Sequence, residues 1–134
     1  MRGQAAFEYL ILFSIALLLL GILVWYSQEV TELNRDEMIV ANAISALNKI
    51  VEASNIVYTQ GKPSQITVNV YIPERVTSID LNGNMIIMKV ATGSGTSDII
   101  AMSKAPLQGS IPTGSGTKKL KVIAEDNYVY ITQG

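Results

Sequence analysis

The carboxylate of Glu8 is the first side chain in this sequence whose type and position could do chemistry. It stands at the start of an otherwise apolar run of 18 residues, Tyr9 to Tyr26, which only Ser14 and Gly21 interrupt. As a helix rising about 1.5 Å per residue, this run is long enough to cross a bilayer. An acidic group inside hydrocarbon costs up to about 3.5 kcal/mol on insertion scales, so it normally has a specific partner. We therefore expect Glu8 to accept a charge-assisted hydrogen bond from a cation.

The amino-acid composition lacks most of the residue types on which common catalytic sites depend. The 134 residues include no His and no Cys, which excludes Ser-His-Asp and Cys-His nucleophiles, disulfides and the usual zinc and copper sites. Paired carboxylates could still act as a glycosidase, and the candidates are Glu74, Asp80, Asp98, Glu125 and Asp126. They fall mainly at expected strand ends and turns, where acidic residues are ordinary. We expect no enzymatic activity, no cofactor and no metal site.

The charge balance gives no sign of a nucleic-acid partner. The formal net charge is −1, with three basic and six acidic residues up to Gln60 and seven basic against five acidic residues after it. A protein that binds nucleic acid would need a far more basic face.

A family resemblance supplies a candidate partner for Glu8. The segment RGQAAFEYL, in which Arg2 and Gly3 precede Gln4, Glu8 and Tyr9, resembles the class III signal peptide of archaeal type IV pilin-like proteins. In that family a membrane-bound prepilin peptidase cleaves between the Gly and the Gln. The resemblance implies that residues 1–3 are a cleaved leader and that the mature chain starts at Gln4. Glu8 would then be the acidic fifth residue, paired with the new α-amino group of Gln4 in its own chain or in an adjacent one.

The resemblance also implies a fold, a function and partners. The family's fold is a lollipop in which a long N-terminal hydrophobic helix carries a small antiparallel β-sheet or β-sandwich head. Its members assemble through their helices into a surface filament, a homo-oligomer that can serve adhesion. Assembly would require a membrane platform protein and a cytoplasmic ATPase. The subunit would first be a single-pass membrane precursor with its N-terminus in the cytoplasm, and later part of an extracellular filament.

Other interpretations of the apolar run are open. A Sec signal peptide would need a small-residue cleavage site after the run, and Ile22 to Tyr26 provide none. A plain membrane anchor fits the hydropathy and accounts for Trp25 and Tyr26 as interfacial aromatic residues, but leaves Glu8 and the leader unexplained. The alternatives to a major pilin are a minor pilin-like priming or binding component and, third, a membrane-anchored ligand-binding β domain.

The helix is expected to continue well beyond the apolar run. No Pro interrupts residues 4 to 62, Gly61 offers a left-handed cap, and Pro63 stops the helix. We divide it into a hydrophobic membrane or filament-core segment, residues 4–27, and an amphipathic continuation, residues 28–61. The continuation carries an apolar stripe with helical spacing, whose members are Val30, Leu33, Val40, Ile44, Leu47, Val51 and Tyr58. Five further residues widen this apolar face, which predicts burial under a covering domain; they are Met38, Ile39, Ala43, Ile50 and Val57.

Residues 62–134 are typical of an antiparallel β head of five or six strands. Strands are expected at 65–72, 76–81, 85–91, 98–103, 120–124 and 128–132, with an irregular stretch from Leu107 to Ile111. Asn82-Gly83 predicts a tight hairpin turn. The glycine-serine segments 92–97 and 113–117 are expected as surface loops. Three lysines, Lys118, Lys119 and Lys121, are expected to form a small basic cluster on a solvated strand face.

Overall fold

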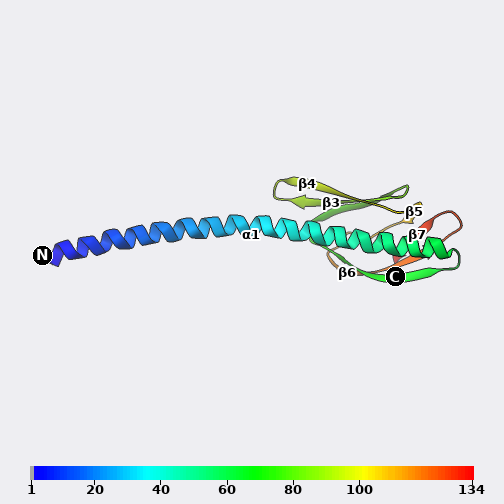
Figure 1. Cartoon of the computed structure of the whole chain (residues 1–134), viewed down its shortest axis with the longest axis horizontal. Helices are drawn as coiled ribbons and strands as arrows, with labels where there is room; N and C mark the ends of the chain where they lie inside the picture. Colours follow the sequence, from blue (N-terminus) through cyan, green and yellow to red (C-terminus); the bar gives the residue numbers. More distant parts are fainter. Residues whose placement is uncertain (1) are drawn as a thin grey trace. The chain divides into compact units, whose positions relative to one another are not determined.

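The computed structural model describes residues 2–134; Met1, the first residue of the expected leader, lies outside the described residues. The layout is α+β, with one long N-terminal apolar helix followed by a small β head, as the sequence predicts. The elements are α1 (Arg2–Gln60), β1 (Gln65–Ile72), β2 (Val76–Asn82), β3 (Met85–Thr92), β4 (Gly95–Met102), β5 (Leu107–Gly109), β6 (Gly116–Ala124) and β7 (Val129–Gln133) (Figure 1). The chain divides into two units at the Arg35–Asp36 bond. We call them the N-terminal unit and the head unit (Asp36–Gly134).

Helix α1 ends where the sequence predicts. Gly61 adopts a positive φ of 75°, and its amide donates to the Val57 carbonyl at 2.9 Å. This is the left-handed cap for which glycine is the preferred residue. The helix begins at Arg2 instead of Gln4, so the expected start was two residues late.

The second part of α1 belongs to the head unit and supplies one wall of its core. In Figure 1 this part of the helix, coloured cyan to green, runs along the strands. Its buried residues are Ile39, Ala43, Ala46, Leu47, Ile50, Ala53, Ser54 and Val57. The expected apolar face is confirmed in part, since Ile39, Ala43, Leu47, Ile50 and Val57 are buried, whereas Ile44 and Tyr58 of its stripe stay 45% and 40% exposed. Ala46 and Ala53, which the pattern did not include, are buried as well, because small side chains let the strands approach the helix closely.

Two sheets complete the head. The four-stranded sheet has the order β1-β6-β7-β5, and the three-stranded sheet has the order β2-β3-β4. Their inner faces join the helix in one hydrophobic cluster that includes Val70, Ile86, Met88, Leu120 and Ile131, each fully buried. The alternation predicted for Gln65–Ile72 is confirmed, with its even-numbered side chains turned inward. The expected β2–β3 hairpin is confirmed, and β6 and β7 form a second antiparallel pair.

The prediction gave too few strands and expected every strand pair to be antiparallel. The described residues form seven strands, and β5 lies inside the stretch expected to be irregular, where it pairs parallel to β7. Two further strands begin early, β4 at Gly95 and β6 at Gly116, inside the glycine-serine segments expected as loops. Both glycines have strongly positive φ angles, 138° and 109°. Glycine and serine carry no β-branched side chain, so the alternation pattern did not predict strands there. The backbone still forms strand pairs, Gly95 with Thr92 and Gly116 with Ile72.

The expected basic cluster is split by the alternation of β6. Lys119 and Lys121 lie on the outer face, opposite Asn69 and Thr67 of β1. Lys118 points to the other side and is half-buried. Only two of the three lysines therefore share a surface.

Candidate functional site

The residues singled out by the sequence lie in the first turns of α1. Arg2, Gly3, Gln4, Glu8 and Tyr9 are all helical and exposed. Gln4 and Glu8 are separated by four residues, so they occupy the same side of the helix one turn apart. Side chains in a helix lean toward its N-terminus, which directs the Glu8 carboxylate toward the turn that contains Gln4. This arrangement suits pairing of Glu8 with a positive group at Gln4.

The Gly3–Gln4 bond lies inside the helix. A protease generally needs an extended segment at the bond that it cuts, so cleavage at this bond would require the first turn to unwind. The first turn has no preceding carbonyls to hold its amides, and glycine weakens a helix by about 1 kcal/mol relative to alanine. Unwinding at Gly3 therefore costs less than unwinding in the interior of α1.

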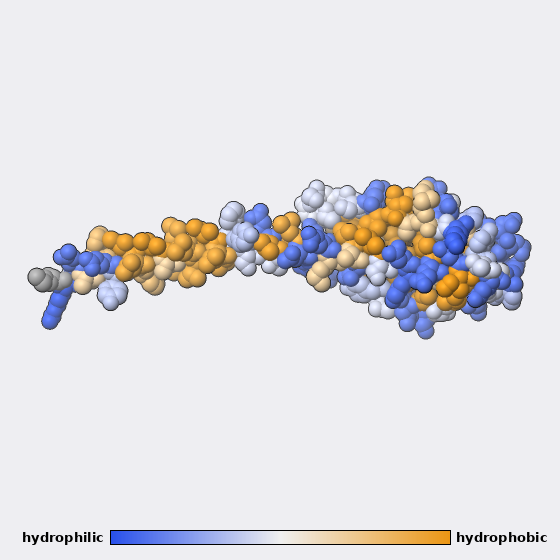
Figure 2. Space-filling view, viewed as in Figure 1, coloured by the Kyte–Doolittle hydropathy of each residue, from blue (hydrophilic) through white to orange (hydrophobic). Residues whose placement is uncertain are grey.

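An uninterrupted apolar surface follows Glu8. Every large hydrophobic side chain from Tyr9 to Trp25 is between 45% and 75% exposed, and Figure 2 shows this stretch as a band of hydrophobic surface. Ser14 within this stretch donates to the Leu10 carbonyl at 2.8 Å, so its polar hydrogen is satisfied within the helix. This part of α1 is long and apolar enough to cross a membrane, and none of it is buried within the chain.

Asp36 joins α1 to the strands at the first residue of the head unit. Its carboxylate accepts a hydrogen bond from Arg75 Nη1 at 2.9 Å and another from the Gly93 amide at 2.9 Å. Arg75 adopts a left-handed φ of 65°. Asp36 thus ties the loop before β2 and the β3–β4 turn to the helix. Sequence reasoning missed this contact because its members lie 39 and 57 residues apart.

A second polar joint lies near the C-terminal end of the helix. The Asn55 side-chain oxygen accepts hydrogen bonds from the Ser103 hydroxyl at 3.1 Å and from the Lys104 amide at 2.9 Å. Beyond the helix, Lys62 Nζ lies 3.2 Å from a Glu125 carboxylate oxygen and 3.8 Å from one of Asp126. The hydrogen bond to Glu125, with the nearby negative charges, raises the pKa of Lys62 above its ordinary value of 10.5.

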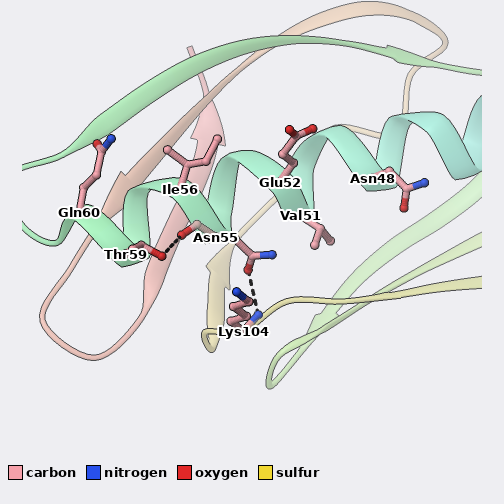
Figure 3. Close-up of a pocket in the computed structure, with 8 residues that line it drawn as sticks. All are labelled: Asn48, Val51, Glu52, Asn55, Ile56, Thr59, Gln60 and Lys104. Carbon is pink, nitrogen blue, oxygen red and sulfur yellow. Dashed lines mark hydrogen bonds between the residues drawn. The ribbon is translucent and has the colours of Figure 1, made fainter.

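A groove in the head runs along α1. It has a volume of about 480 Å³ and is lined by Asn48, Val51, Glu52, Asn55, Ile56, Thr59, Gln60 and Lys104. In Figure 3, Asn55 and Val51 point toward the Lys104 side, whereas Glu52 and Ile56 point to the opposite side of the helix. The polar groups do not converge on one point, as they would in a small-molecule site.

The candidate acid–base carboxylates are dispersed. Asp80 and Asp98 lie on β2 and β4, and Glu125 and Asp126 lie in the β6–β7 turn, while Glu74 precedes β2. Of the five, Asp98 lines a groove, of about 450 Å³ between α1 and β4, and no second carboxylate lines that groove.

Comparisons of this chain with protein-family models, with curated proteins and with solved structures gave no match.

Proposed function

We propose that this chain is the structural subunit of an archaeal type IV-like pilus. A prepilin peptidase cleaves the leader, residues 1–3, and the subunit then assembles through α1 into a surface filament that serves adhesion. The observation that carries the proposal is the fully exposed apolar stretch from Tyr9 to Tyr26, which directly follows Glu8 and the segment resembling a class III signal peptide. Such a surface needs either lipid or other apolar helices around it.

The proposed mechanism is an exchange of environments. In the membrane, lipid covers the apolar stretch; in the filament, the helices of other copies cover it, so extraction loses little hydrophobic stabilisation. A separate cytoplasmic ATPase and a membrane platform protein supply the work. Orientation follows from the charges, since Arg2 precedes the stretch whereas Glu29 and Glu32 follow it, which favours a cytoplasmic N-terminus and an exported head.

Cleavage gives Glu8 its partner. Hydrolysis between Gly3 and Gln4 releases the leader and leaves an α-amino group on Gln4, one helical turn before Glu8. In the dry interior of a helix bundle, an unpaired charge of either sign is costly, so the carboxylate and the amino group stabilise the assembled state only as a pair. The pair can form within one chain or between adjacent chains.

The test is to shear surface fibres from cells that express the chain and to sequence the main band from its N-terminus. A dominant band that begins at Gln4 is the expected result. A native subunit that still begins at Met1 would contradict the cleavage step, and fibres that contain none of this chain would refute the proposal. A processed but scarce band would favour a minor, priming or binding component.

A further inference from the structure

The outer faces of the two head sheets differ in chemistry. On the three-stranded sheet, Met85 pairs with Met102 and Ile87 pairs with Ile100 across β3 and β4. Residues directly opposite in an antiparallel ladder point to the same side, so these four form one outward apolar cluster. Ile100 and Met102 are 58% and 65% exposed. We call this set the outer apolar cluster.

Acidic residues border the outer apolar cluster. Asp80 of β2 lies opposite Ile87, and Asp98 of β4 lies opposite Lys89, one row farther along β3. With two acidic residues and one basic residue, the outward strand positions of this sheet carry a net charge of −1. Ile100 also lines the groove of about 450 Å³ between the helix and β4, which is an edge strand of this sheet. The outer face itself is apolar and carries a small negative charge.

The outer face of the four-stranded sheet is its complement. Lys119 and Lys121 occupy its centre, and the outward positions of β1, β6, β7 and β5 include no acidic residue. Two tyrosines, Tyr71 and Tyr130, stand on the same face and are 49% and 40% exposed. Tyrosine is enriched at protein interfaces, where its ring packs against apolar side chains and its hydroxyl can form a hydrogen bond.

We propose that the outer face of the four-stranded sheet of one copy docks on the outer face of the three-stranded sheet of another copy. The contact joins a face of charge +2 to a face of charge −1, and aromatic side chains to the outer apolar cluster. It uses two different surfaces, so it is heterologous, and repeated heterologous contacts generate open helical assemblies. The inference rests on the proposed function and identifies the head surfaces that meet in the filament.

The area that this contact would bury is too small for a stable isolated dimer, but it suits a contact that is repeated along a filament. A face of three strands, each seven or eight residues long, measures roughly 27 by 14 Å, or about 400 Å² per partner. Isolated contacts of this size lie below the usual range for stable complexes, about 1,200 Å² in total. Along a filament, the helix contacts hold neighbouring heads at high effective concentration, so a weak contact becomes populated. The sequence has no Asn-x-Ser/Thr site, so no N-linked glycan would cover either face.

Cysteine cross-linking in sheared fibres tests the contact, because the chain has no cysteine of its own. Asn69→Cys marks the outer face of the four-stranded sheet, and Asn82→Cys marks that of the three-stranded sheet; both positions are exposed. Treating fibres of the double variant with a short bis-maleimide should give a ladder of covalent oligomers. Either single variant should stay monomeric. The matched control pairs Asn69→Cys with Asn127→Cys in the exposed β6–β7 turn, and should also stay monomeric.

Charge reversal provides a second, independent measurement. Lys119→Glu with Lys121→Glu should lower fibre yield at least about tenfold, because it places like charges face to face. The conservative Lys119→Arg with Lys121→Arg should keep the wild-type yield. Fibres that contain the chain but give neither a ladder nor a loss on charge reversal would overturn the contact and leave the proposed function standing. Fibres that lack the wild-type chain would overturn both.

Discussion

Removing the Asp36 carboxylate should destabilise the head unit at its first residue. Asp36→Ala deletes the hydrogen bonds from Arg75 and from the Gly93 amide, both 2.9 Å long. The side chains of the ion pair are 20% and 33% exposed, so the pair itself contributes at most about 1 kcal/mol. Hydrogen bonds to charged groups contribute about 1.5 to 3 kcal/mol when buried, and exposure reduces this. We expect a loss of about 2 kcal/mol.

Thermal unfolding of the full chain in detergent measures this loss. For a unit of this size, about 2 kcal/mol corresponds to a fall in Tm of roughly 10 °C. Asp36→Asn retains an acceptor for the Gly93 amide and should lose about half as much. Glu37→Ala, at the exposed position next along the helix, is the matched control and should change Tm by less than about 2 °C.

Hydrogen exchange locates the effect. The Gly93 amide should exchange faster in Asp36→Ala than in the Glu37→Ala control, whereas amides of β6 and β7 should change only through the global loss of stability. A double-mutant cycle with Arg75→Met should give a coupling below about 1 kcal/mol. Wild-type stability and unchanged Gly93 exchange in Asp36→Ala would refute the assignment of this carboxylate as the joint between α1 and the strands.

Three further predictions concern other parts of the chain. Gly109→Ala should destabilise the head by more than about 3 kcal/mol, because Gly109 has a φ of 109° and an added Cβ would collide with the Ile131 backbone; unchanged denaturant unfolding would contradict this. Because folding raises the pKa of Lys62, its pairing with Glu125 adds stability below about pH 10.5, and this is lost as the pH rises through the folded value. Lys62→Met should remove that part of the alkaline slope in Tm, and an identical slope in the variant would argue against it. Glu8→Ala should reduce fibre yield while leaving membrane insertion intact, as fractionation and electron microscopy would measure; a wild-type yield would count against the pairing with Gln4.

Sequence patterns predicted where the helix and the strands lie more completely than they predicted which helix residues are buried. The alternation in Gln65–Ile72 and the Gly61 cap both act locally, and both are confirmed. The buried face of the helix was predicted only in part: Ala43 was included, whereas Ala46 and Ala53 were not, because small side chains carry little weight in a hydrophobic pattern. The same pattern counted Val30 and Leu33, which lie outside the head unit and stay exposed.

Contacts between residues far apart in the sequence could not be predicted from local sequence patterns. The three-residue strand β5 forms because β7 accepts it as a parallel neighbour, and no pattern within Leu107–Gly109 indicates this. The joint at Asp36 likewise needs a loop and a turn that only the folded head brings together. For the candidate site, the sequence predicts Gly3, Gln4 and Glu8 from a motif, and their roles stay predictions.

The position of β7 in its sheet limits how early the head can finish folding. This strand lies between β6 and β5, so it is an interior member of its sheet although residues 129–133 supply it. Ile131, fully buried on it, helps to close the core. During synthesis from the N-terminus, the preceding strands emerge without this central neighbour. The four-stranded sheet can therefore be completed only after residues 129–133 have been made, and the head becomes rigid in one late step.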